Sequence, residues 1–202
     1  MVSQKGLVKK YMSKCLFSLF ISQFLAFGAY TQVAADSIES HLQNAEYYLD
    51  QSQPALALEY YQKAKRHAEH QNQQVSIARK IGIAYAISGN CEKALEFFHR
   101  CAKFHQNNGN RLKYSKCLNN LGNCYSETGE HDKAIIYYRK ALEIRKELCV
   151  EPGQLYRNLG DEFFFLSQPD SGHFYLEMAL KHATDPETKA AIWNNLAAGY
   201  LD

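Results

Sequence analysis

Two short clusters in the sequence have residue types and spacings that suit a transition metal. His67 and His70 are three residues apart, and Cys101 and His105 are four apart, so each pair would share one face of a helix. Protein zinc sites normally use three or four ligands, and neither pair has an obvious third ligand nearby in the sequence. We therefore expect no metal site.

Motifs that support catalysis or phosphate binding are absent from the sequence. It contains no glycine-rich phosphate loop, H-E-x-x-H, G-x-S-x-G or C-x-x-C. The 23 Lys and Arg residues nearly balance the 21 Asp and Glu residues, without a basic block that would follow a phosphate backbone. We expect no catalytic residue, no cofactor and no nucleic-acid partner, which leaves binding by surface side chains as the chemistry to explain.

The N-terminal segment has the features of an export signal. Four lysines precede an apolar run over residues 15–27, and the small residues Val33 and Ala35 follow it. We expect cleavage after Ala35 and a periplasmic or secreted product. An uncleaved membrane anchor is the alternative, although the run is shorter than the ~20 apolar residues that span a bilayer.

Cysteine usage does not suggest a disulfide framework. Five cysteines follow residue 35, so at least one is unpaired, and their spacing resembles no small disulfide-rich domain. We expect them to act mainly as buried apolar residues.

The strongest signal is internal repetition. Around Gly122 the sequence has Leu121, Gly122 and Tyr125, followed by Ala134, Tyr138 and Ala141. Related patterns recur at intervals of 37 to 40 residues around Ala45, Gly82 and Gly160, and a partial one surrounds Ala197. Within each copy, apolar residues recur at three and four positions, which is typical of helices.

This pattern resembles the tetratricopeptide repeat (TPR), with L-G-x2-Y on a first helix and A-x3-F-x2-A on a second. The resemblance covers roughly residues 38–202 and implies an all-α solenoid of antiparallel helix pairs in a right-handed superhelix. It implies repeats at about 38–71, 75–108, 115–148 and 153–185, with a partial fifth at 190–202. A generic helical bundle is the alternative, but it gives no reason for small residues at near-constant intervals.

Turn-forming residues agree with this register. Ser88-Gly89-Asn90 and Thr128-Gly129-Glu130 fall between the two helices of their repeats. Pro54 and Pro169 occupy equivalent places in two other repeats, where proline is favoured in the first turn of a helix.

The resemblance implies a concave groove lined mainly by the first helix of each repeat. In the family, the residue two before the small position of this helix is often an asparagine that binds a peptide backbone; Asn120, Asn158 and Asn195 match, whereas Gln43 and Lys80 depart. Neighbouring polar and basic residues would attract a carboxylate or an acidic segment. The groove candidates are Arg79, Lys80, Lys116, Asn119, Asn120, Asn123, Arg157, Asn158, Asp161, Asn194 and Asn195.

Two functions are compatible with these expectations. The first is an exported scaffold that binds a protein or peptide in the groove. The second is the extracytoplasmic sensing part of a truncated bacterial signalling protein, such as a TPR-containing histidine kinase or transcriptional regulator. A cytoplasmic peptide receptor follows if the export signal is inactive. The partial last repeat suggests a truncated or longer protein, or self-association through the C-terminal helix.

Overall fold

The computed structural model describes residues 37–198, within which every regular element is an α-helix. The expected export signal lies outside the described residues, as do residues 199–202 of the partial fifth repeat. The helices are α2 (Ile38–Asp50), α3 (Pro54–His67), α4 (Gln71–Ile87), α5 (Cys91–Asn107), α6 (Arg111–Glu127), α7 (His131–Glu147), α8 (Gly153–Phe165), α9 (Pro169–His182) and α10 (Pro186–Ala198). No helix in this described part is long and apolar enough to cross a membrane.

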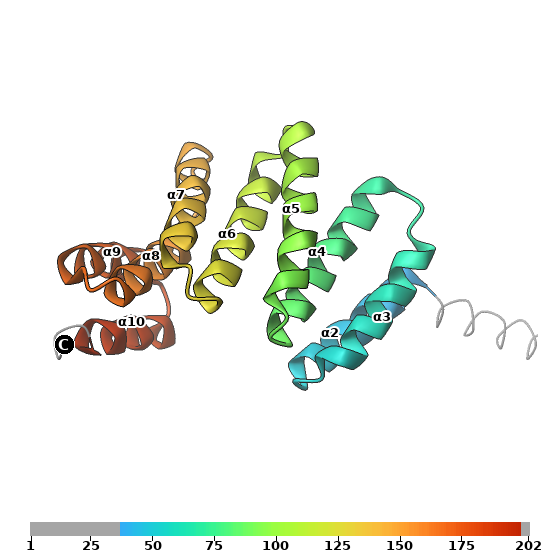
Figure 1. Ribbon diagram of the computed structural model, residues 1–202, viewed down its shortest axis with the longest axis horizontal. Helices are drawn as coiled ribbons and strands as arrows, with labels where there is room; N and C mark the ends of the chain where they lie inside the picture. The colour runs from blue at the N-terminus through green and yellow to red at the C-terminus, as the bar shows by residue number, and fades with distance from the viewer. Residues whose placement is uncertain (1–36, 199–202) are drawn as a thin grey trace, which may run out of the picture.

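The helices form consecutive pairs that follow one another along the molecule, with α2 and α10 near opposite ends (Figure 1). Each pair packs mainly against its neighbours, so the all-α TPR-like solenoid expected from the repeats is confirmed. The helices α4, α6 and α10 begin at residues 71, 111 and 186, four residues before the repeat starts inferred from the sequence.

The glycine landmarks lie where the two helices of a pair approach most closely. A Cβ atom built on Gly82 would lie 2.7 Å from a ring carbon of Phe98, and one on Gly122 would lie 2.4 Å from a ring carbon of Tyr138. On Gly160 it would lie 2.7 Å from Leu176. These distances leave no room for a side chain, because the large residue on the second helix fills the space.

The turn inside each pair uses one backbone conformation. Gly89 and Gly129 have φ values of 78° and 76°, in the left-handed region that glycine adopts without strain. Ser52 and Ser167 occupy the equivalent turns with φ values of 56° and 54°. Pro54 and Pro169 then begin the following helices, as the sequence predicted.

In each complete pair, one aromatic ring from each helix forms a stack beside this turn. The ring centroids of Tyr125 and Tyr137 are 5.3 Å apart with an interplanar angle of 7°. Equivalent stacks join Tyr48 to Tyr60, Tyr85 to Phe97, and Phe163 to Tyr175. Stacked rings at the same place in four pairs stabilise the angle between the two helices.

One hydrogen bond to a buried carboxylate joins α7 to α8. Glu162 is only 2% exposed, and the Nδ1 atom of His131 donates a hydrogen bond of 2.7 Å to its carboxylate. The His131 ring also stacks on Phe165, with centroids 4.8 Å apart. His131 therefore satisfies a carboxylate that would be costly to bury alone.

The interface between α5 and α6 contains four buried cysteines. Cys91, Cys101, Cys117 and Cys124 are buried free thiols, as expected, whereas Cys149 is exposed. Burial raises the pKa of the Cys101 thiol to about 11 and those of Cys117 and Cys124 to about 12.

Alkylation with iodoacetamide at pH 8 is therefore expected to modify Cys149 rapidly and the four buried thiols very slowly. The reactive species is the thiolate, and burial of Cys101, Cys117 and Cys124 keeps it scarce at this pH. Mass spectrometry of peptides from the native chain checks this, with the chain in 6 M urea, about the concentration that unfolds small proteins, as the control. Equal labelling of Cys117 and Cys149 in the native chain would contradict it.

Candidate functional site

The first helices of the pairs, α2, α4, α6, α8 and α10, together form a surface that we call the A-helix face. Equivalent positions on these helices are counted from the small residue that marks each repeat in the sequence, which we call the landmark. We call the position two residues before the landmark the donor position. We call the position directly after the landmark the acceptor position. The donor positions are Gln43, Lys80, Asn120, Asn158 and Asn195.

Side chains at donor positions reach back to the preceding first helix. Lys80 on α4 forms an ion pair with Glu46 at the acceptor position of α2. Asn158 on α8 donates its amide to the Oδ1 atoms of Asn123 and Asn119 on α6, each at 3.3 Å. Asn195 on α10 donates to Asp161 on α8 at 2.7 Å. These contacts form polar rungs between successive repeats.

The rung between α4 and α6 is missing. The donor is Asn120, but the acceptor position on α4 is Ile83, which has no polar side-chain atom. The Nδ2 atom of Asn120 is buried and has no hydrogen-bond partner among the described residues. Of the rungs expected between α2 and α10, this one alone has an amide without its acceptor.

A surface hollow of about 500 Å³ lies at this missing rung. Ile83 and Ile87 of α4 form one side, Asn120 and Glu127 of α6 form the other, and Phe98 contributes from α5. Ile87 is 56% exposed. The site therefore combines apolar walls, a buried amide donor and an exposed carboxylate at the rim.

The other groove candidates differ in accessibility. Lys116, Asn123 and Asn194 are exposed, and Arg79, Lys80, Arg157, Asn158, Asp161 and Asn195 are half-buried. Asn119 is only 8% exposed and accepts a hydrogen bond from Asn158. The structure thus gathers Asn119, Asn123 and Asn158 into one network, in which their amides bind each other rather than lie free along the surface.

Asp161 shows how strongly the A-helix face is desolvated near its rungs. Burial raises the pKa of the Asp161 carboxyl, and this shift is opposed by the hydrogen bond from Asn195 and by the charge of Arg157. The Asp161 to Asn195 rung is therefore structural, because its acceptor is already satisfied within the chain.

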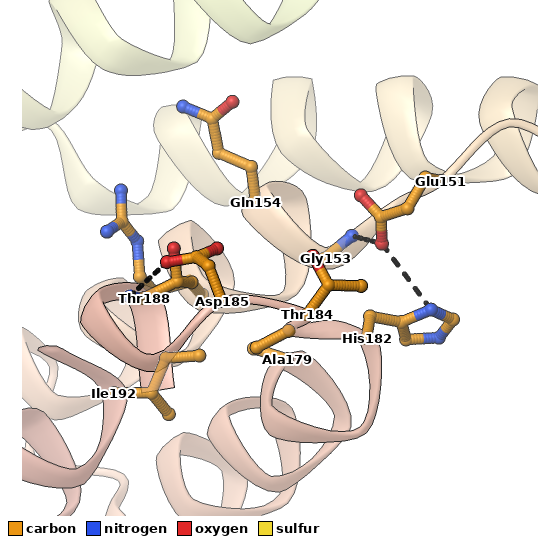
Figure 2. Close-up of a pocket in the computed structure, with 11 residues that line it drawn as sticks. Glu151, Gly153, Gln154, Ala179, His182, Thr184, Asp185, Thr188 and Ile192 are labelled. Carbon is orange, nitrogen blue, oxygen red and sulfur yellow. Dashed lines mark hydrogen bonds and ion pairs between the residues drawn. The ribbon is translucent and has the colours of Figure 1, made fainter. Parts of the chain in front are cut away.

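A second hollow of about 320 Å³ lies where α8, α9 and α10 meet. Figure 2 shows Glu151 directed toward the backbone nitrogen of Gly153 and the ring of His182. Asp185 accepts from the backbone nitrogen of Thr188 at 2.7 Å. Both carboxylates bind backbone N–H groups in the first turns of helices, so these two groups of the hollow serve the fold.

The part of the chain that the structure describes does not bring together a set of metal ligands. Within residues 37–198, no three His, Cys, Asp or Glu side chains converge on a common point. Cys101 is buried and its thiol donates to the backbone oxygen of Val75 at 3.4 Å. The Cys101 and His105 spacing thus belongs to a packed helix.

Sequence reasoning missed the two residues that make the hollow. Ile83 and Ile87 are not among the groove candidates, and Asn120 is grouped with Asn158 in the expected asparagine ladder. The signal was present, because in the four complete repeats the residue directly after the landmark is polar in three, Glu46, Asn123 and Asp161, and apolar in one, Ile83.

Residues 73–147 match the tetratricopeptide repeat family model. This segment contains α4 to α7, and hence the hollow at the missing rung.

Two curated relatives are similar in sequence. Mouse protein O-mannosyl-transferase TMTC2 is 30% identical over 103 residues, which are 48% of this chain and 12% of that protein. Response regulator aspartate phosphatase A of Bacillus subtilis (strain 168) is 29% identical over 127 residues, which are 60% of this chain and 30% of that protein. The chain therefore spans less than a third of the length of either relative.

Solved structures share the fold at low identity. BtubC (BKLC) from P. vanneervenii has a TM-score of 0.72 at 23% identity, covering 96% of this chain and 83% of that one. A Rap protein complexed with Competence and Sporulation Factor has a TM-score of 0.70 at 15% identity, covering 81% and 48%. The TPR-like repeats support a role in protein–protein interaction.

Proposed function

We propose that this protein is a binding module that holds a peptide or polypeptide segment along the A-helix face. The observation that carries the proposal is the buried, unpartnered amide of Asn120 beside a hollow of about 500 Å³. An apolar hollow with a few convergent polar groups is the usual form of a ligand site. The protein acts by binding, without catalysis or a cofactor.

The proposal assigns the groove candidates two roles. Lys80, Asn119, Asn123, Asn158, Asp161 and Asn195 hold neighbouring repeats together through the rungs. Lys116 and Asn120 face the ligand, with Arg79 and Arg157 contributing positive charge along the face. A matched set of rigid helices positions these groups without loops, which limits the ordering entropy lost on binding.

Selection from a random dodecapeptide library displayed on phage, with the full chain as bait, tests this function. A photocrosslinking amino acid replaces either Lys116 on α6 or Lys140 on α7, both of which are exposed. Selected peptides are expected to crosslink from position 116 and not from position 140. Failure to recover any binding peptide, or crosslinking from position 140 alone, would overturn the proposal.

A second candidate function is the sensing part of a bacterial signalling protein. It is favoured by the sequence similarity to response regulator aspartate phosphatase A and by the structural likeness to Rap proteins, including RapI at a TM-score of 0.69. In this role the same A-helix face receives a signalling peptide, and binding is transmitted to an output domain. The two candidates differ in what the solenoid controls, not in where the ligand binds.

We also propose that the protein works outside the cytoplasm, after cleavage following Ala35. The lysines, the apolar run and the small residues of the N-terminal segment support this location. Mass spectrometry of the product secreted or stored in the periplasm of an expressing bacterium is expected to find Asp36 as the first residue. An intact N-terminus in the cytosol would point to a cytoplasmic peptide receptor, and one in the membrane fraction to an anchor.

A further inference from the structure

The side-chain contact that links the other successive first helices is missing between α4 and α6. Donor positions on α4, α8 and α10 all bind the acceptor position of the preceding first helix. The donor on α6 is present as Asn120, but Ile83 replaces the acceptor. Within residues 37–198, the Nδ2 atom of Asn120 thus has no acceptor.

A buried amide without a partner is destabilising, because it loses its hydrogen bonds to water and gains none in return. Leucine at position 120 would pack against Ile83 at no such cost. An acceptor from outside the described residues would satisfy the amide of Asn120.

The surroundings of Asn120 indicate the chemistry of that acceptor. Ile83 and Ile87 present an aliphatic wall, and Ile87 is 56% exposed at the rim. The carboxylate of Glu127 lines the same hollow and makes no ion pair within residues 37–198. The groups that the hollow offers to a ligand are thus an amide donor, an aliphatic surface and a negative charge.

We propose that the missing rung is the anchoring subsite for a peptide in which an aliphatic residue is adjacent to Lys or Arg. The aliphatic side chain enters the hollow against Ile83 and Ile87. A backbone carbonyl of the peptide accepts a hydrogen bond from Asn120 Nδ2, completing the rung in place of α4. The basic side chain pairs with Glu127, whose charge selects a cationic neighbour. This inference rests on the proposed function and adds the sequence preference of its ligand.

Three substitutions in the full chain separate the parts of this subsite. Asn120→Leu removes the donor and keeps the volume, and it is expected to fold at least as stably as the wild type. Ile83→Asn supplies the acceptor that the other rungs have, so that Asn120 is satisfied internally. Glu127→Gln removes only the charge. Asn158→Leu is the matched control, because it removes an equivalent amide that is already paired.

The peptides selected from the dodecapeptide library serve as probes, with fluorescence anisotropy as the measurement. We expect enrichment of an aliphatic residue next to Lys or Arg. We expect at least tenfold weaker binding to Asn120→Leu and to Ile83→Asn, and several-fold weaker binding to Glu127→Gln with reduced salt dependence. Asn158→Leu is expected to lower the thermal midpoint of the helical circular dichroism signal while changing affinity less than threefold.

Each contrary outcome has a distinct meaning. Peptides that bind the wild type, Asn120→Leu and Ile83→Asn equally would overturn this inference and leave the proposed function intact. Acidic or aromatic consensus sequences would also overturn it. A library that yields no binding peptide would overturn both proposals. Dimerisation of the wild type that is lost in Asn120→Leu, measured by sedimentation, would assign the hollow to a second copy of the chain and overturn the peptide assignment.

Discussion

Replacing Gly122 with valine is expected to lower the free energy of unfolding by about 3 kcal/mol, the upper part of the usual range for overpacking. A Cβ atom at this position would already lie 2.4 Å from a ring carbon of Tyr138. The ring cannot easily move, because Tyr138 is 2% exposed and its hydroxyl donates to Asn123 at 2.9 Å. The two helices of the pair must therefore separate.

Urea denaturation followed by circular dichroism measures this effect. Lys116→Val is the matched control, since it introduces the same β-branched residue into α6 at an exposed position. Exposed substitutions of this kind usually change stability by less than about 0.5 kcal/mol. Equal shifts of the urea midpoint for the two variants would show that Gly122 does not set the distance between α6 and α7.

The second large effect is expected for His131→Ala. Removal of the imidazole leaves the carboxylate of Glu162, which is 2% exposed, without its 2.7 Å hydrogen bond from α7. Leaving a buried acceptor without its hydrogen bond costs about 1–3 kcal/mol, and more for a charged group. We expect about 3 kcal/mol and not more, because the His131 side chain is 22% exposed and its removal admits water.

The double variant His131→Ala with Glu162→Leu separates loss of the pair from loss of the charge. It is expected to recover most of the stability, because no buried carboxylate remains. Arg111→Ala, which breaks the exposed ion pair with Glu147, is the control and is expected to cost less than about 1 kcal/mol. Hydrogen exchange would localise the effect to α7 and α8. A cost for His131→Ala as small as that for Arg111→Ala would contradict a structural role for the pair.

The rungs suggest how one surface both supports the solenoid and binds a ligand. Lys80, Asn158 and Asn195 link their repeats to the preceding one, so substitutions there mainly affect stability. Asn120 lacks such a link within the described residues. A peptide that completes this rung also joins α4 to α6. Binding of the peptide then stiffens the array of helices, which is a physical means by which a sensing protein could respond to its ligand.

The sequence by itself determined the helices, their pairing and the landmarks of close approach. Gly82, Gly122 and Gly160 recur in register with the large residues that pack on them, and turn residues such as Gly89 and Gly129 end the first helices. These features are local or repeat along the chain, so spacing alone is enough to place them. The positions of Asn120, Asn158 and Asn195 on the A-helix face follow from the same register.

Only the tertiary structure decided which of these polar residues are satisfied and which remain open. Asn158 and Asn195 find acceptors on the preceding first helix, whereas Asn120 faces Ile83 across the same gap. His131 meets Glu162 for the same reason, although neither residue belongs to the repeat pattern. Hydrogen-bond partners depend on how far neighbouring repeats rotate and approach, and that distance results from packing summed over both helices rather than from the spacing of any one motif.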